Sequence, residues 1–540
     1  MVFSTRPRVR IPIVIITLVS AVLLAGVSFR GISVNANGTA QQPITKGLLT
    51  PSTTIVPPDA PATVPRGVRR IRTGNTQSAS ISTPSGSQLS GNVGALLQNF
   101  NGTSSLDSEK TNFGAEFEPP DQGLCVGNGF VVEPVNSAYN IYRTNGTKIA
   151  GPFNVNRLFN DGFRQFTSDP RCHYDKTTNT WFAIILFISS NSKVGRIDLS
   201  VNPTGDPTTP WTTYRIDTTD PGNRGCPCFG DQPLLGIDQD NIYVSTNEFS
   251  ILGPQFNGAQ LYAISKSELV ALARSVHFVH FGSLRIGGAI AASVQPAISF
   301  GTPDAEYFMN SLDPNGTFDN RIGVWAMTNR QAVSQGGTPT LSHLVITSEP
   351  YGVPPPAIQK GSTSKLDSGD DRMQQVQYIN GQLWGELGTA VTIPNDNNER
   401  AGAAWFEVKP HLSGQTIGSA AITKQGYVTL KGNYLIYPAI QASPTGTAAM
   451  IMTLSGKDFF PSVVYTVLQK GQSTFGPLQV AATGTGPYFR KSTRWGDYSW
   501  AILDPQGTSF WMATEYIPPK SSQTTDGKQN WGTRVIEVSA

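Results

Sequence analysis

The chain has 540 residues and a formal net charge of +3, and only 14% of its residues are charged. The basic excess is confined to the N-terminal end, because nine lysines and arginines but only one acidic residue precede position 73. The remainder is mildly acidic, which argues against a nucleic-acid-binding protein. No long amphipathic helical pattern occurs, so a helical bundle is excluded as well.

Residues 1–30 have the pattern of an export signal. Arg6, Arg8 and Arg10 precede an uncharged, largely apolar run from Ile11 to Phe29. This pattern is typical of a signal peptide or of an N-terminal membrane anchor, and the sequence leaves both open. In either case we expect the rest of the chain to be secreted or held on the extracytoplasmic side, with membrane contact through this segment alone.

Residues 31–92 have the composition of a linker. They are rich in Pro, Ser, Thr and Gly and contain no aromatic residue. Such a segment buries too little apolar surface to offset the entropy lost on ordering. We therefore expect a disordered spacer between the N-terminal segment and a folded region at 93–540.

The folded region is built from repeats of a strand, a tight turn and a second strand. The clearest copy runs from Arg494 to Asp504, turns at Pro505-Gln506-Gly507, and continues from Ser509 to Tyr516. Equivalent positions recur about every 60 residues, at Gly123, Arg171, Pro233, Pro296, Met373, Pro438 and Ser499. Each repeat has room for four short strands, which predicts an all-β fold: a single β-propeller of seven four-stranded blades. A β-sandwich is the alternative.

Closure of this propeller requires a strand from the N-terminal side. The last repeat supplies only three strands and ends at Val535–Val538. The one apolar run between the linker and the first repeat is Val93–Phe100. We expect this run to pair with the last strand, because an open sheet edge favours aggregation.

The four cysteines, Cys125, Cys172, Cys226 and Cys228, suggest disulfides in an exported chain. Cys226 and Cys228 are separated only by Pro227, and a bridge between them would close a small, strained ring. We therefore expect one of these two cysteines to pair with Cys125 or Cys172. Zinc binding is the competing interpretation, but no matching set of His or Cys ligands supports it, and no firm metal site is predicted.

Signatures of catalysis are absent from the sequence. It contains no Gly-x-Ser-x-Gly elbow, no His-Glu-x-x-His zinc motif and no phosphate-binding glycine loop. The more specific observation is that five of the seven repeats carry an aspartate two residues before the equivalent position: Asp121, Asp169, Asp231, Asp371 and Asp497.

These aspartates have two interpretations. If each repeat begins with its innermost strand, the carboxylates converge at one end of the axial channel and form a ligand-binding ring. Such a ring suits Ca²⁺, a cationic ligand or a polyol. The alternative is that each aspartate caps its own turn by accepting hydrogen bonds from nearby backbone amides.

Several motifs resemble a known group of proteins. Trp495–Ser499, Pro119-Pro120-Asp121, Asp169-Pro170 and Gly432–Pro438 resemble secreted bacterial β-propeller proteins that are loosely grouped with the sialidase-like superfamily. The resemblance implies a propeller fold and export. The sialidase turn motif Ser-x-Asp-x-Gly-x-Thr-Trp has only a near match at Ser311–Phe318, and neither the arginine triad nor the tyrosine nucleophile of sialidases can be assigned. The resemblance therefore does not extend to sialidase chemistry.

Two functions fit these observations. The first, which we expect, is a non-catalytic binding or scaffold module for glycans, wall polymer or protein. The alternative is a carbohydrate-active hydrolase or lyase that uses Asp231 and Asp497, with Arg171, Arg372 or Arg494 orienting the substrate. We expect a monomer whose partner is a glycan or cell-surface polymer, and no cofactor, Ca²⁺ being the one candidate ion.

Overall fold

The computed structural model describes residues 43–52, 81–82, 94–189, 191–312, 318–490 and 493–540. The chain divides into two compact units, residues 1–35 and 36–540, and the first lies outside the described residues. The predicted signal peptide or anchor at 1–30 therefore lies outside them too. Within the described part, no helix has the length and apolar character needed to cross a membrane.

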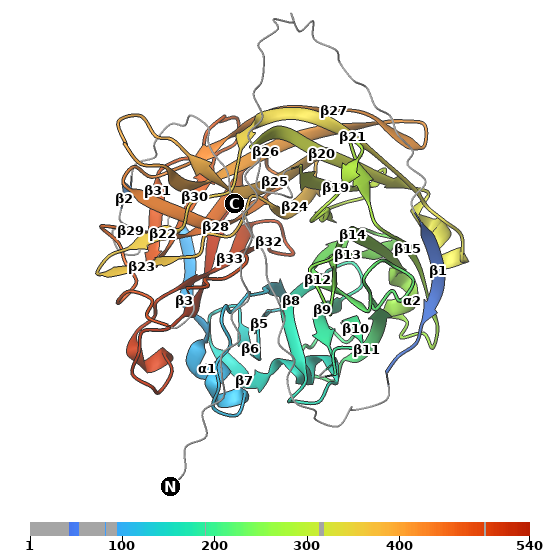
Figure 1. Ribbon diagram of the computed structural model, residues 1–540, viewed down its shortest axis with the longest axis horizontal. Helices are drawn as coiled ribbons and strands as arrows, with labels where there is room; N and C mark the ends of the chain where they lie inside the picture. The colour runs from blue at the N-terminus through green and yellow to red at the C-terminus, as the bar shows by residue number, and fades with distance from the viewer. Residues whose placement is uncertain (1–42, 53–80, 83–93, 190, 313–317, 491–492) are drawn as a thin grey trace, which may run out of the picture. The chain divides into compact units, whose positions relative to one another are not determined.

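Most strands of the second unit form groups of four antiparallel strands, which we call blades and number in chain order (Figure 1). The first blade contains β4 (Cys125–Gly127), β5 (Phe130–Val135), β6 (Ala138–Arg143) and β7 (Lys148–Asn154). The second contains β8 (Phe166–Asp175), β9 (Thr180–Ile188), β10 (Gly195–Asn202) and β11 (Thr212–Asp217). The third contains β12 (Cys228–Ile237), β13 (Asn241–Ser250), β14 (Phe256–Ser265) and β15 (Val276–Phe281).

The remaining blades repeat this arrangement. The fourth contains β18 (Gln295–Ser299), β19 (Glu306–Ser311), β20 (Asp319–Thr328) and β21 (Thr340–Tyr351). The fifth contains β24 (Met373–Ile379), β25 (Gln382–Val391), β26 (Arg400–Ser413) and β27 (Thr416–Val428). The sixth contains β28 (Asn433–Ala442), β29 (Ala448–Gly456), β30 (Ser462–Leu468) and β31 (Leu478–Ala482). The seventh contains β32 (Trp500–Leu503), β33 (Ser509–Tyr516), β34 (Gly532–Ser539) and β3 (Leu96–Ser104).

Short elements connect the blades. Two hairpins are formed by β16 (Arg285–Ile286) with β17 (Ala289–Ile290) and by β22 (Ala357–Gln359) with β23 (Ser362–Leu366). The helical segments are α1 (Ser105–Thr111), α2 (Lys266–Val270), η1 (Val155–Phe159), η2 (Arg330–Gln335) and η3 (Lys520–Ser522). Helix α1 begins at a capping box, in which Ser104 and Asp107 satisfy each other's backbone amides.

The innermost strands of consecutive blades contact one another, and the last blade contacts the first. Strand β12 pairs with β18 in parallel, and β18 pairs with β24 in the same way. In the seventh blade, the Ser499 hydroxyl donates to the Tyr437 carbonyl of the sixth blade at 2.6 Å. The Asp497 amide donates to Asp121 of the first blade at 2.7 Å. The prediction of an all-β propeller is confirmed.

The strand that completes the seventh blade comes from the N-terminal side. Strand β3 pairs with β34 in antiparallel register, with Leu96 opposite Val538 and Phe100 opposite Val535. The Phe100 ring packs against Tyr142 of the first blade, with ring centroids 5.2 Å apart. The expected pairing of the two chain segments is therefore present, because β34 would otherwise be an exposed apolar edge.

Part of the segment expected to be disordered is strand. Strand β1 (Ile44–Leu49) pairs with β15 on the outer edge of the third blade, and Leu49 is buried there. Strand β2 (Ile81–Ser82) pairs in parallel with β31 of the sixth blade. The expectation of a disordered linker is wrong at these two places, because each strand covers a sheet edge that would otherwise be open. Apart from residues 43 and 50–52, the rest of the expected linker lies outside the described residues.

The disulfide pairing differs from the expected one. Cys125 of β4 is bonded to Cys172 of β8, so this bridge joins the innermost strands of the first two blades. Cys226 is bonded to Cys228, and their Cα atoms are 4.4 Å apart. The prediction that one of these two pairs with Cys125 or Cys172 is wrong. Both observed Cα separations, 4.4 and 5.5 Å, fall in the range that a disulfide spans.

The two bridges should contribute unequally to stability. Cys125 and Cys172 are 47 positions apart, whereas Cys226 and Cys228 are two apart. Replacing the first pair by alanine should cost about 4 kcal/mol in the free energy of unfolding, and replacing the second about 1.5 kcal/mol, because a longer loop loses more unfolded-state entropy. Urea unfolding of the two double variants measures this difference. Equal losses would contradict the entropic account of the long bridge.

Candidate functional site

Four of the five aligned aspartates lie together, in what we call the carboxyl cluster: Asp121, Asp169, Asp231 and Asp497. Asp121 and Asp497 precede β4 and β32, while Asp169 and Asp231 lie in the N-terminal halves of β8 and β12. Each therefore stands where its innermost strand begins, at the same end of the propeller. Their charges act on one another: Asp121 interacts with Asp169 and Asp497, and Asp231 interacts with the same two.

Irregular backbone places these carboxylates. Asp121 and Asp169 have φ values of 45° and 60°, in the left-handed region that only a few residue types, aspartate among them, adopt readily. The register of the β8–β9 pair shifts after Ser168, and that of the β12–β13 pair shifts after Asp231. Bulges of this kind redirect a side chain and are common beside active sites.

Asp121 and Asp169 form a buried carboxyl pair. Asn136 bridges the two residues by donating its Nδ2 to Asp121 at 2.7 Å and accepting the Asp169 amide at 2.8 Å, and the two carboxyl groups interact electrostatically. Burial, together with the charges of Asp497 and Asp169, raises the pKa of Asp121 well above its usual range. Burial and the charge of Asp497 raise the pKa of Asp169 as well. Both carboxyl groups therefore favour the protonated form more than an exposed aspartate does.

Asp231 and Asp497 are the partly exposed members of the cluster, and their environments differ. Burial and the charge of Asp169 raise the pKa of Asp231 to about 7, although Arg372 acts in the opposite direction. Asp497 accepts a hydrogen bond from Arg494 Nη2 at 2.6 Å, and 38% of its side chain is exposed. An ion pair with arginine favours the carboxylate form. Asp497 thus has an arginine partner at hydrogen-bond distance, whereas burial favours the protonated form of Asp231.

Two further arginines adjoin the cluster. Arg372 pairs with Asp370, donates to the Gln232 carboxamide, and interacts with the charges of Asp497 and Asp231. Arg171 is buried, with its guanidinium carbon 3.4 Å from the centre of the Tyr498 ring. Burial lowers the pKa of Arg171. Among the described residues, its guanidinium nitrogens have no hydrogen-bond partner.

The structure thus brings together most of the residues singled out from the sequence. The fifth aligned aspartate, Asp371, is buried beside the site, and it is the neighbouring Asp370 that pairs with Arg372. Sequence reasoning missed Asp370, Gln232 and Asn136. The run Asp370-Asp371-Arg372 was a signal for the first of these, because it places a second carboxyl group between the aligned aspartate and the preceding loop.

No metal centre is assigned to the carboxyl cluster. Among the described residues, the group placed closely enough to hold an ion is Cys226, Cys228 and Glu248. The sulfur atoms of these cysteines are bonded to each other, so they are not available as thiolate ligands. Binding of Ca²⁺ stays a prediction.

The sequence matches no protein-family model and no curated protein. Similar solved structures include an α-L-arabinofuranosidase of family GH93 from Fusarium graminearum in complex with arabinobiose, with 10% identity, 81% of this chain and 97% of that chain covered, and a TM-score of 0.34. They also include the Hadza microbial sialidase Hz136, with 10% identity, 75% of this chain and 73% of that chain covered, and a TM-score of 0.37. Trypanosoma rangeli sialidase in complex with sialic acid is a third, with 9% identity, 76% of this chain and 59% of that chain covered, and a TM-score of 0.35. The activity of this chain has to be inferred from its own side chains.

Proposed function

We propose that the protein is a carbohydrate-active hydrolase that cleaves a glycosidic bond at the carboxyl cluster. The observation that carries this proposal is the contrast between Asp231 and Asp497. Burial raises the pKa of Asp231 to about 7, so a large fraction of this group is protonated at neutral pH, whereas Asp497 is ion-paired with Arg494. Glycoside hydrolysis uses two such carboxyl groups, one as a proton donor and one as a carboxylate.

In this mechanism Asp231 is the general acid. Its proton passes to the glycosidic oxygen as the bond to the anomeric carbon breaks, so the leaving sugar departs as an alcohol. The carboxylate left on Asp231 is then stabilised by Arg372, which already interacts with it. A water molecule supplies the hydroxyl group that the anomeric carbon gains.

Asp497 acts on the face of the anomeric carbon opposite to Asp231. Its carboxylate acts either as the base for the attacking water or as the nucleophile, and the separation of the two carboxyl groups decides between these routes. The transition state has oxocarbenium character, so nearby negative charge lowers its energy. Asp169 contributes to the negative potential of the site, and its charge helps to raise the pKa of Asp231.

The arginines fit a role in orienting the substrate. Arg372 and Arg494 are each paired with an aspartate and partly exposed, with 29% and 27% of their side chains accessible. A paired guanidinium group still has donors to spare, and it can hold sugar hydroxyl groups in a fixed direction. The alternative function, a non-catalytic binding module, shares this surface but does not need the difference between Asp231 and Asp497.

A hydrolysis screen on the full chain tests the proposal. Neutral and acidic oligosaccharides are incubated with the protein, and new reducing ends are measured. We expect cleavage of at least one substrate, and a loss of 100-fold or more in rate for Asp497→Asn, because the variant removes the carboxylate that acts at the anomeric carbon. Asp458→Asn is the control, since Asp458 is a surface residue with 54% of its side chain exposed.

Two results of this screen would count against a hydrolase. One is the absence of cleavage across the whole panel, which would favour a binding module. The other is cleavage by Asp497→Asn at the rate of the Asp458→Asn control, which would place the chemistry elsewhere.

A further inference from the structure

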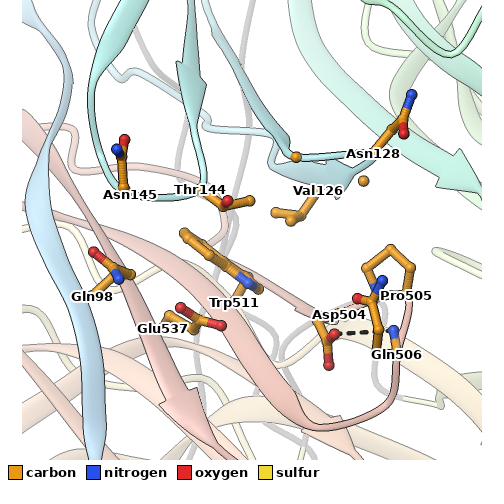
Figure 2. A pocket seen from close by; sticks show the side chains of 12 residues that line it. Gln98, Val126, Asn128, Thr144, Asn145, Asp504, Pro505, Gln506, Trp511 and Glu537 are labelled. Carbon is orange, nitrogen blue, oxygen red and sulfur yellow. Dashed lines mark hydrogen bonds between the residues drawn. The ribbon is translucent and has the colours of Figure 1, made fainter.

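A second cleft lies at the other end of the innermost strands. It has a volume of about 300 Å³ and lies between the first and seventh blades (Figure 2). The turn after β4 contributes Asn128, whereas Asp121 precedes the same strand. At about 3.3 Å per residue, the cleft is roughly 20 Å from the carboxyl cluster. It is therefore a separate site.

One wall of the cleft is a row of side chains across the closing sheet. Gln98 stands opposite Glu537, and Glu537 stands opposite Trp511, on the consecutive strands β3, β34 and β33. Residues directly opposite each other in a sheet project on the same face. Glu537 accepts a hydrogen bond from the Ser509 hydroxyl at 2.7 Å, which fixes its carboxyl group at the back of the cleft.

The other wall consists of turns that carry carboxamides. Asn128 and Asn145 come from the two turns of the first blade, and Gln506 comes from the β32–β33 turn (Figure 2). Asn128 donates to Gly205 and Asn145 accepts from Thr147, so both are held in place. Within the part of the chain that the structure describes, the side chains of Gln98 and Gln506 make no hydrogen bond to protein. Their donors and acceptors are available to a ligand.

The charged groups that line the cleft restrict the class of ligand it can bind. The titratable groups that line the cleft are Asp504 and Glu537, and no lysine or arginine of the described residues lines it. Asp504 is occupied by the amides of its own turn, including those of Thr508 and Ser509. An anionic ligand would face two carboxyl groups, and the Lys176 ammonium group beside the cleft already donates to the Pro505 carbonyl. A hydrocarbon would leave the carboxamides of Gln98 and Gln506 without partners. A neutral ligand rich in hydroxyl groups fits both conditions.

We propose that this cleft binds a neutral sugar unit of a glycan, independently of the carboxyl cluster. Gln98, Gln506 and the two asparagines supply paired donors and acceptors for the hydroxyl groups, and Glu537 accepts from one more. Because the walls belong to the first and seventh blades, a bound sugar connects the two ends of the propeller. The proposal does not depend on the hydrolase function and holds equally for a binding module.

Calorimetric titration tests the proposal on the full chain in an Asp231→Asn background, in which hydrolysis is suppressed. The probes are neutral tetrasaccharides of glucose, galactose, mannose and arabinose, with tetragalacturonate as the anionic counterpart. We expect saturable binding of at least one neutral probe, weakened tenfold or more when Gln98→Ala and Gln506→Ala are added. Tetragalacturonate should show no binding that depends on these two residues.

The double variant also has to fold. Neither carboxamide is buried, so its melting temperature without ligand should equal that of the parent protein. The neutral probe should raise the melting temperature of the parent but not of the double variant, because only the parent binds it at this cleft. The proposal is overturned by three results: no neutral probe binds, binding survives both substitutions, or tetragalacturonate binds through the same two residues.

Discussion

Deletion of residues 94–104, which include the closing strand β3, is expected to destabilise the protein by several kcal/mol or to cause aggregation. The deletion exposes the edge of β34 and removes Phe100 from its contacts with Tyr142 and Trp511. Each buried apolar side chain is worth about 1.5–3 kcal/mol, and an exposed apolar edge invites pairing with another chain. The total is comparable with the stability of an ordinary domain.

A buried carboxyl group adds to this loss. Glu133 of the first blade accepts hydrogen bonds from the Thr103 amide at 2.6 Å and from the Thr533 hydroxyl at 2.5 Å. Deletion removes Thr103 and leaves a buried acceptor short of partners, which costs about 1–3 kcal/mol. Because burial already raises the pKa of Glu133 to about 7, the group is neutral at low pH and costs most when it ionises. The loss caused by the deletion should therefore grow as the pH rises through 7.

Thermal melting and size-exclusion chromatography measure the effect. The matched control is deletion of residues 44–49, which form β1 and also cover a sheet edge, but as a fifth strand outside the four-stranded blade. We expect the control to melt close to the intact chain and the β3 deletion to melt far below it. Equal melting temperatures for the two deletions would show that β3 does not hold the propeller together.

Replacement of Asp231 by asparagine is expected to lower kcat 10²- to 10⁴-fold on an oligosaccharide substrate, because proton donation to the leaving oxygen is lost. In the intact enzyme the rate should fall as the pH rises through about 7, where Asp231 loses its proton. This limb of the pH–rate profile should be missing in the variant. The loss of kcat caused by Asp231→Asn should depend on the leaving group of the substrate.

The leaving-group dependence separates an acid from a merely structural residue. A nitrophenyl glycoside of the same sugar departs without protonation, so Asp231→Asn should be much less impaired on it than on the oligosaccharide. A structural defect would reduce both rates alike. Equal losses on the two substrates, or an unchanged alkaline limb in the variant, would remove Asp231 from the role of acid.

Much of the fold could be predicted because the repeated strand–turn–strand unit recurs at a regular spacing along the sequence. The seven equivalent positions of the repeat lie within, or just before, the innermost strands β4, β8, β12, β18, β24, β28 and β32. The closing strand could be found as well, since Val93–Phe100 is an isolated apolar run and the last repeat is incomplete. The edge strand β1 could not, because Ile44–Leu49 is a short run within a segment of linker composition, and its pairing depends on a distant sheet edge.

The site was predictable only as far as backbone position determines it. Repeat alignment gave four members of the carboxyl cluster, because equivalent positions in a propeller lie at the same end. It did not indicate Asp370, which pairs with Arg372, because Asp370 stands one position before the aligned aspartate. The disulfides were mispaired because spacing along the chain does not report that Cys125 and Cys172 lie in adjacent innermost strands. The sugar cleft depends on Gln98 and Gln506, which are 408 positions apart and carry no motif.

The central claim is that sugar chemistry occurs at the carboxyl cluster. The most direct test is a crystal structure of Asp231→Asn soaked with an oligosaccharide that the intact enzyme cleaves. We predict a glycosidic oxygen within about 3 Å of the residue 231 side chain, with Asp497 on the other side of the anomeric carbon and Arg372 against a sugar hydroxyl. Sugar bound only in the cleft beside Gln98 and Gln506, with the carboxyl cluster empty, would contradict the claim.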